Sequence, residues 1–112
     1  MKGELYDTME EFERAAAAQP AARYTLRLFV AGASMRSKAA VANVKSICER
    51  FLAGRYELEV VDVYQQPALA RSEQLVAAPT LVKRLPKPER RIVGDMSDEH
   101  RVLIGLDLRS RP

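Results

Sequence analysis

Segments with the two-residue period of a β-strand alternate along the chain with segments that have the period of an α-helix. Residues 24–31 place Leu26, Leu28 and Val30 on one side of a predicted strand. A predicted helix follows, and its apolar face consists of Ala40, Val44, Ile47, Cys48 and Phe51. A second strand is predicted for residues 56–63. A strand–helix–strand unit of this kind forms two parallel strands joined by a right-handed crossover.

The second half of the chain predicts another helix, a pair of strands and a last helix. A short helix is expected over residues 67–75, with a proline at its first position. Strands over residues 80–85 and 89–93 are expected to pair in antiparallel fashion, and Ser97 to cap a helix that starts near Asp98. The resulting order, βαβαββα, predicts an α/β, thioredoxin-like fold.

This predicted domain covers residues 23–112 and is preceded by a leader, residues 1–22. Apolar residues recur in the leader at helical spacing, namely Leu5, Met9, Phe12 and Ala16. Thr8 and Glu11 form a capping box, and Pro20 ends the segment. The leader is therefore predicted to be an extra helix, which either packs on the domain or frays, or else serves as a docking or oligomerisation arm.

Composition narrows the class of protein. The chain has 112 residues, 47% of them hydrophobic, and this length and composition suit one compact domain. Its net charge is +3. No apolar run reaches the roughly 20 residues of a membrane span, and the acidic start does not resemble a secretory signal. These features predict a cytoplasmic protein with no membrane partner.

One stretch is strongly basic, and it surrounds the predicted hairpin of the last two strands. Its members are Lys83, Arg84, Lys87, Arg90 and Arg91. The stretch is expected to form an exposed positive rim. Binding to nucleic acid usually adds aromatic side chains on which bases stack, and none lies between Lys83 and Arg91. An acidic protein partner or a solvated edge is therefore favoured over nucleic acid.

Residues for catalysis or metal binding are lacking. Redox proteins of this fold carry Cys-x-x-Cys after the first strand, where residues 32–37 read Gly-Ala-Ser-Met-Arg-Ser. The only cysteine, Cys48, lies on the apolar helix face, where burial is expected to raise its pKa. The only histidine, His100, has no partner ligands at metal-binding spacing. The chain is predicted to be no enzyme and to need no metal or cofactor.

Several ordered segments together resemble the KaiB family of cyanobacterial clock proteins. They are Leu28-Phe29-Val30-Ala31-Gly32, Ala78-Pro79-Thr80-Leu81, Leu85-Pro86, Ile92-Val93-Gly94-Asp95 and Val102-Leu103-Ile104-Gly105-Leu106-Asp107-Leu108. The resemblance covers residues 24–108 and includes the missing Cys-x-x-Cys.

This resemblance implies a non-enzymatic protein that binds the ATPase ring of KaiC. It also implies competition with a KaiB-like sensor domain of a histidine kinase, and help in capturing KaiA. Members of the family exist in two folds. One is a monomer with the thioredoxin-like fold, which binds KaiC, and the other is a ground-state tetramer with the order βαββααβ. The thioredoxin-like form is the one expected here.

Three residues are candidates for the balance between these folds: Pro79, Gly105 and Asp107. Pro79 can adopt a cis peptide bond at low cost, and a glycine such as Gly105 weakens a helix by about 1 kcal/mol. Gly105 and Asp107 match positions that influence the balance in the family. In addition, the apolar residues of segment 102–108 fit both a strand period and a helix period.

By resemblance, the surface that faces KaiC includes Ala68, Ser72, Lys83, Arg90 and Arg91. Gln74 and Glu59 stand where familiar members carry lysine, which argues against capture of KaiA. Two alternatives remain open. One is a KaiB-like sensory or stress-response module outside the clock, and the other is a thioredoxin-type redox protein, which requires an accessible Cys48.

Overall fold

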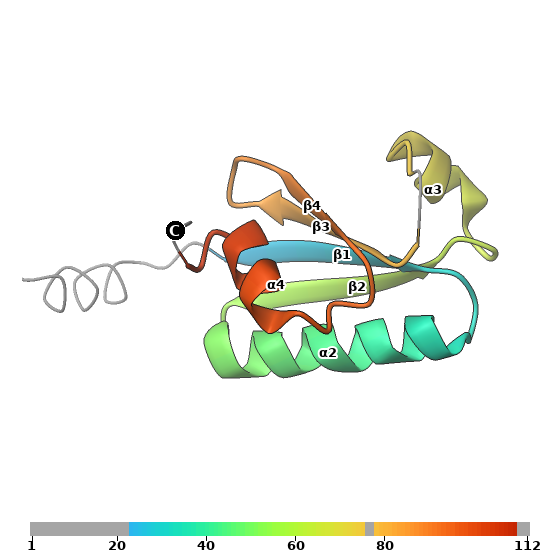
Figure 1. The fold of residues 1–112 in the computed structure, drawn as a ribbon. Coiled ribbons are helices and arrows are strands. Elements are labelled where there is room, and N and C mark those ends of the chain that lie inside the picture. Colours follow the sequence, from blue (N-terminus) through green and yellow to red (C-terminus); the bar gives the residue numbers. More distant parts are fainter. Residues whose placement is uncertain (1–22, 76–77, 110–112) are drawn as a thin grey trace, which may run out of the picture.

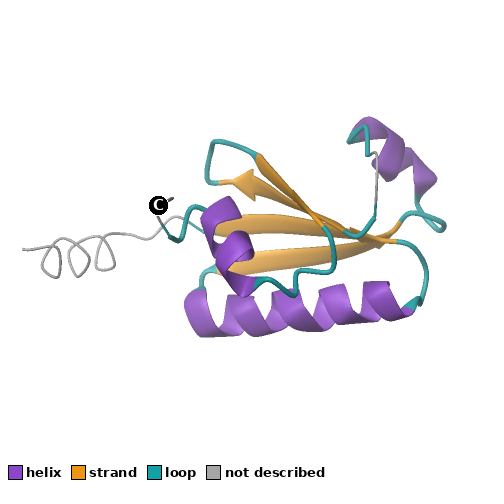
Figure 2. Ribbon diagram, viewed as in Figure 1, coloured by secondary structure: helices purple, strands orange, loops and turns teal. Residues whose placement is uncertain are grey.

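A computed structural model describes residues 23–75 and 78–109, so the predicted leader helix lies outside the described residues. Seven elements follow one another in the order predicted, βαβαββα (Figures 1 and 2). They are β1 (Tyr24–Val30), α2 (Met35–Phe51), β2 (Tyr56–Asp62), α3 (Pro67–Ser72), β3 (Thr80–Leu85), β4 (Arg90–Val93) and α4 (Glu99–Gly105).

The four strands form one sheet with the order β2-β1-β3-β4. β1 runs parallel to β2, as the crossover through α2 requires, while β3 is antiparallel to both β1 and β4. The register between β1 and β3 shifts between Thr25 and Leu26, which leaves Arg84 as an extra residue in β3. This topology is thioredoxin-like, and the structure therefore adopts the predicted fold rather than the alternative order βαββααβ.

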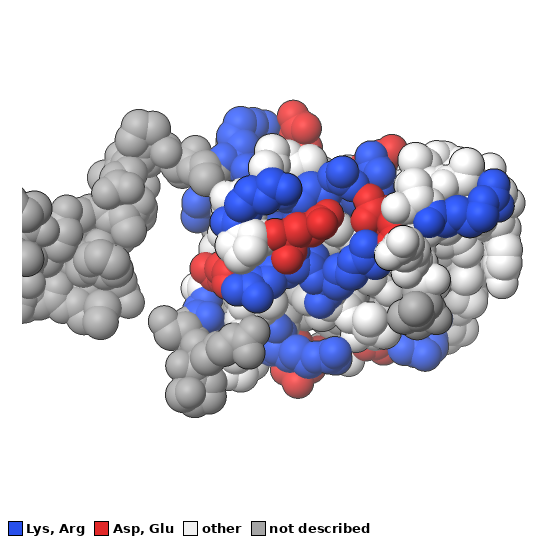
Figure 3. Space-filling model, turned by 90° about the horizontal axis from the view of Figure 1, so that it is seen from above, with Lys and Arg blue, Asp and Glu red and all other residues white. Residues whose placement is uncertain are grey.

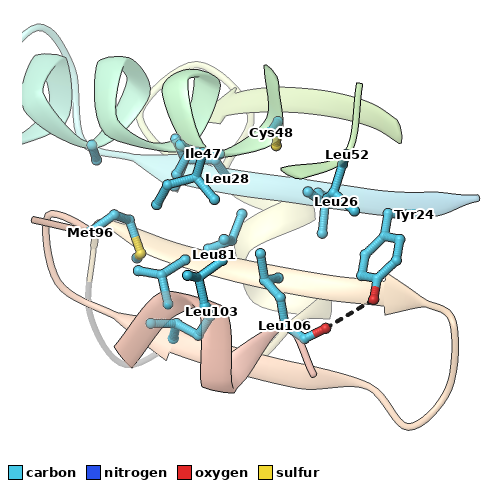
Figure 4. Packing of buried hydrophobic residues seen from close by; sticks show 14 of the residues in the cluster. Tyr24, Leu26, Leu28, Ile47, Cys48, Leu52, Leu81, Met96, Leu103 and Leu106 are labelled. Carbon is cyan, nitrogen blue, oxygen red and sulfur yellow. Dashed lines mark hydrogen bonds between the residues drawn. The ribbon is translucent and has the colours of Figure 1, made fainter. Parts of the chain in front are cut away.

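Two helices, α2 and α4, cover one side of the sheet, which we call the helical face (Figure 1). Leu26, Leu28 and Val30 of β1 point into it, as the two-residue period predicted. The main buried members are Tyr24, Leu26, Leu28, Ile47, Cys48, Leu52, Leu81, Met96, Leu103 and Leu106 (Figure 4). This cluster is the principal core, because most of the buried apolar residues belong to it.

The opposite side of the sheet, which we call the open face, has a much smaller core. Phe29, Val61 and Val82 are buried there, and Leu69 and Leu75 pack against them from α3 and the turn after it. α3 covers only one end of this face (Figure 2). Outside this cluster, the described open face carries mainly polar and charged side chains, and Val93 is 40% exposed on it.

Side chains cap the first turns of α2 and α4. Ser34 caps α2, because its hydroxyl accepts a hydrogen bond from the Ser37 backbone N–H at 3.1 Å. Asp98, and not the predicted Ser97, caps α4, because its carboxylate accepts from the backbone N–H of Arg101 at 3.2 Å. The backbone N–H of Ser97 is instead bonded to the Asp95 carboxylate at 3.0 Å.

β1 and β2 each end one residue earlier than predicted, and two further boundaries require correction. α3 ends at Ser72 rather than at residue 75, because Gln74 adopts a left-handed backbone with φ of 54°, which no helix continues. β4 begins at Arg90, one residue later than predicted, because its pairing with β3 starts from Lys83 opposite Arg90.

Candidate partner-binding surface

α3 is a short helix whose outer side is free of contacts with the core. Ala68 and Ser72 are exposed on it, and the helix contains no fully buried residue. Leu69 anchors the helix to the small core of the open face. The helix therefore presents small side chains to a partner while one side rests on the sheet.

Glu73, directly after α3, is the electrostatic centre of this surface. Its side chain is 10% exposed and is surrounded by three guanidinium groups. Glu73 forms an ion pair with Arg84 and another with Arg91 at 3.2 Å, and it lies 4.0 Å from Arg27. The hydrogen-bonded pairs hold the end of α3 against β3 and β4, and the longer contact with Arg27 connects it to β1.

Further ion pairs continue across the open face. The Nε atom of Arg27 donates to the Glu59 carboxylate at 2.8 Å, which connects β1 to β2. Near the start of the same strands, Arg23 lies 4.0 Å from Glu57. Figure 3, which views this side of the molecule, shows positive and negative side chains interleaved over the sheet. The open face is therefore a mixed-charge surface, and not a positive field.

The predicted exposed positive rim at the hairpin is wrong in one main respect: Lys83 is buried. Its side chain is 1% exposed, because it shares the helical face with Leu81 two residues earlier. Its ammonium group forms an ion pair with Asp107 at the end of α4. Arg90, on the same face, lies 3.4 Å from the Asp107 carboxylate.

These cations also affect the acid–base behaviour of Asp107. Hydrogen bonding from Lys83, followed by that from Arg90, lowers the pKa of the Asp107 carboxyl below its ordinary value. The group is thus held in its charged form, as a buried ammonium partner requires. Lys83 and Asp107 fasten the end of α4 to β3 and do not present a free surface.

The structure consequently divides the five predicted contact residues into two groups. Ala68, Ser72 and Arg91 lie on the α3 side, since Glu73 joins the helix to Arg91. Lys83 and Arg90 belong to the opposite side of the sheet, around Asp107.

The predicted fold-balance residues all occupy structured positions. Pro79 is buried, and its bond to Ala78 is cis. Gly105 packs so closely on β4 that a Cβ there would lie 2.6 Å from the side chain of Ile92. Asp107 has φ of 61° and ends α4, where the N–H of Leu108 donates to the Leu103 carbonyl at 2.9 Å.

The segment that fits two periods is helical here and docks its apolar residues on the helical face. Val102, Leu103 and Leu106 are all buried. The phenol of Tyr24 donates to the Leu106 carbonyl at 3.1 Å, a buried bond between the first strand and the last helix (Figure 4). Side chains from distant parts of the chain thus hold α4 in place.

The cysteine is placed as predicted. Cys48 is fully buried, and burial raises the pKa of its thiol to about 11. The turn that follows β1 supplies hydroxyl groups in place of thiols, and the Ser37 hydroxyl donates to the Ala31 carbonyl at 3.3 Å. Ser34 of the same turn caps α2.

Outside the charged network, His100 is exposed, and its Nδ1 atom lies 3.0 Å from Arg109. Across residues 23–75 and 78–109, no three carboxylate, histidine or cysteine groups converge in a way that suits a metal ion. In the same ranges, no helix combines the length and apolar character needed to cross a membrane.

Glu73 and Arg27 are central to this surface, although sequence reasoning did not select them. Both look like ordinary solvated charges in the sequence, because their meeting depends on α3 folding back over β1. The burial of Lys83, by contrast, carried a signal in the strand period, which places it on the same side as Leu81.

Comparison with known sequences identifies the family. The model of the KaiB domain matches residues 27–108. The circadian clock protein KaiB3 of Synechocystis sp. is 46% identical over 86 residues, covering 77% of this chain and 84% of the relative. A circadian clock oscillator protein KaiB of Prochlorococcus marinus is 51% identical over 85 residues, covering 76% of this chain and 79% of the relative.

Solved structures agree with the observed fold. The N-terminal domain of Synechococcus elongatus SasA superposes with a TM-score of 0.64 at 29% identity, covering 82% of this chain and 90% of that domain. The thioredoxin Deadhead of Drosophila melanogaster, at 20% identity, has a TM-score of 0.63 and covers 90% of this chain and 93% of its own, which supports the fold alone. Because the domain match spans most of the sequence and these relatives share about half of the aligned residues, this chain belongs to the KaiB family.

Proposed function

We propose that this chain is a non-enzymatic, cytoplasmic clock or signalling protein that binds a KaiC-type ATPase ring through α3 and the adjoining part of the open face. Membership of a family of circadian clock proteins supports the role. The observation that carries the proposed surface is the grouping of Ala68, Ser72 and Arg91 around Glu73. Lys83 is left out of the contact because its ammonium group is buried against Asp107.

Binding, rather than thiol chemistry, is the activity that these residues favour. The thiolate is the reactive form of cysteine, and the Cys48 thiol has a pKa of about 11 and no exposed surface. The mixed charges of the open face suit a partner with complementary charges, where they set specificity and the rate of association more than raw affinity.

A titration of a KaiC-type hexamer, in each nucleotide and phosphorylation state, tests the proposed surface. Ala68→Arg and Ser72→Arg add a bulky cation to exposed positions on α3, and we expect at least a tenfold loss of affinity, about 1.4 kcal/mol. Ala53→Arg is the matched control, because Ala53 is exposed in the turn after α2. This variant is expected to bind the hexamer with unchanged affinity. Absence of binding in every state would refute the proposed function.

If the wild-type chain binds and both α3 variants bind with the same affinity, the contact lies on another surface and the proposed one is refuted.

The proposal includes a second fold, in which the segment that forms α4 becomes a strand. Val102, Ile104, Leu106 and Leu108 alternate as a strand requires. Backbone amide chemical shifts of the wild-type chain across this segment, measured over time and concentration, would reveal a strand population. Helical shifts under all conditions would contradict it.

One competing role is a KaiB-like sensory or stress-response module outside the clock, which the changed charges at Gln74 and Glu59 and the added leader favour. Purification of the chain from its own cells separates the roles. A KaiC-type ATPase among the bound proteins supports the clock role, whereas a sensor or stress-response protein in its place supports the alternative.

A further inference from the structure

A groove of about 610 Å³ lies between the first turns of α2 and the outer edge of β2. Val41 and Val60 contribute apolar surface, and Val60 is 40% exposed although it belongs to a strand. β2 is an outer strand of the sheet, so one of its edges pairs with none of the described strands. Proteins usually cover or block such an edge, because its unpaired backbone groups invite pairing with other chains.

Two lysines, Lys38 and Lys45, rim this groove from α2. Both are exposed, and neither forms an ion pair within residues 23–75 and 78–109. The only acidic lining residue, Asp62, is already engaged, since one carboxylate oxygen accepts from the backbone N–H groups of Gly32 at 3.2 Å and Tyr64 at 2.9 Å. The groove thus suits an apolar segment that is flanked by acidic side chains.

We propose that the leader of the same chain, residues 1–22, is the segment that occupies this groove. The leader has five acidic residues (Glu4, Asp7, Glu10, Glu11 and Glu13) and two basic ones (Lys2 and Arg14). On a helix that begins after the Thr8 cap, its apolar stripe is flanked by Glu11 on one side and by Glu13 on the other, with Arg14 opposite. The apolar stripe can pack on Val41 and Val60 of the groove, and the flanking carboxylates can pair with Lys38 and Lys45 at its rim.

The length of the leader allows it to reach the groove. The chain enters the domain beside the start of β2, because the Tyr24 backbone N–H donates to the Arg55 carbonyl at 2.9 Å. From there to the end of β1 is a strand length of roughly 20 Å. Residues 17–22 span up to roughly 20 Å when extended, and residues 9–16 span about 12 Å as a helix.

A nitroxide label on the full chain tests this placement. In the Arg14→Cys variant the label is attached on the side of the leader opposite the apolar stripe, while Cys48 stays unlabelled because it is fully buried. We expect the methyl NMR signals of Val41 and Val60 to lose most of their intensity, relative to the same protein with the label reduced. Val93, on β4 at the far edge of the sheet, is the internal reference and keeps its signal.

Charge variants then test the mode of binding. Combining Lys38→Glu with Lys45→Glu is expected to restore the Val41 and Val60 signals, and adding Glu11→Lys and Glu13→Lys to suppress them again. Arg101→Glu, a charge reversal at an exposed position of α4, is the matched control. The Val41 and Val60 signals are expected to stay weak in this variant.

Full methyl intensity in the labelled chain would overturn the proposal. A loss that disappears on dilution would assign the groove to the leader of a second copy instead, and a loss that survives the paired lysine changes would refute the charge match.

Discussion

The two faces of the sheet use their residues in opposite ways. Among the described residues, the helical face buries a continuous apolar core under α2 and α4, whereas the open face buries a cluster of three apolar residues and carries a network of ion pairs. Burial of apolar area is the dominant favourable term in folding, while exposed ion pairs contribute little. The difference teaches that the helical face determines stability and leaves the open face available for recognition.

The largest effect is expected in the middle of the helical face. Leu28→Ala removes a fully buried side chain and should lower the free energy of unfolding by about 3 kcal/mol, since the cavity adds to the lost burial. Leu85→Ala, at a position that is 47% exposed, is the control and should cost less than about 0.5 kcal/mol. Urea unfolding measures both, and equal losses would remove the contrast between buried and exposed leucine.

The next largest effect concerns the ion pair at the edge of the helical face. Asp107→Asn keeps a residue that tolerates a positive φ but leaves Lys83 buried without a counter-charge. We expect a loss of about 2 kcal/mol, less than for a fully buried pair because Asp107 is 39% exposed. Lys83→Met removes the buried charge and should cost less than Asp107→Asn. The reverse ranking would show that the pair itself, and not the uncompensated charge, determines stability.

The same pair predicts a pH dependence. Because the folded state lowers the Asp107 pKa, its stabilisation is fully present above the unfolded-state value of about 3.9 and is lost as the pH falls through the folded-state pKa. Unfolding curves of wild type and Asp107→Asn should therefore converge in acid. A constant difference between them at every pH would contradict this origin.

A smaller effect is expected on the open face. Glu73→Gln removes the carboxylate that three arginines share, and we expect a loss of about 1 kcal/mol in the free energy of unfolding. Because α3 then loses its charged anchor, amide exchange should accelerate in α3 more than in α2. Exchange that accelerates equally throughout would place Glu73 within the main cooperative core.

The smallest effect is expected at an exposed pair on the same face. Glu59→Gln breaks the pair with Arg27, but Glu59 is 53% exposed, so the cost should stay below about 0.5 kcal/mol. Chemical unfolding compared with Glu73→Gln measures the difference. A larger cost for Glu59→Gln would show that the network acts as one unit.

Most of the fold could be predicted because the apolar periods are local properties of the chain. β3 was predicted over its observed range, and the buried faces of β1 and α2 followed from period two and period 3.6. Helix ends were less certain, because Ser97 and Asp98 are both suitable caps and only the path of the backbone selects Asp98.

The candidate surface was less predictable, since its central contacts join residues that are distant in the sequence. Glu73 meets Arg27, Arg84 and Arg91 only after α3 folds over the sheet. A charged residue gives no sequence signal of its partner, so Lys83 was expected on the surface although it is buried.

The sequence by itself determined the order of the elements, the apolar side of each and the absence of a thiol pair after β1. Only the tertiary structure decided which charges are partnered, and that the segment 99–105 is a helix packed on β4 and β1. The physical reason is that periodicity is a property of neighbouring residues. Ion pairs and the choice between two compatible periods depend instead on contacts between residues that are distant in the sequence and meet only in the folded chain.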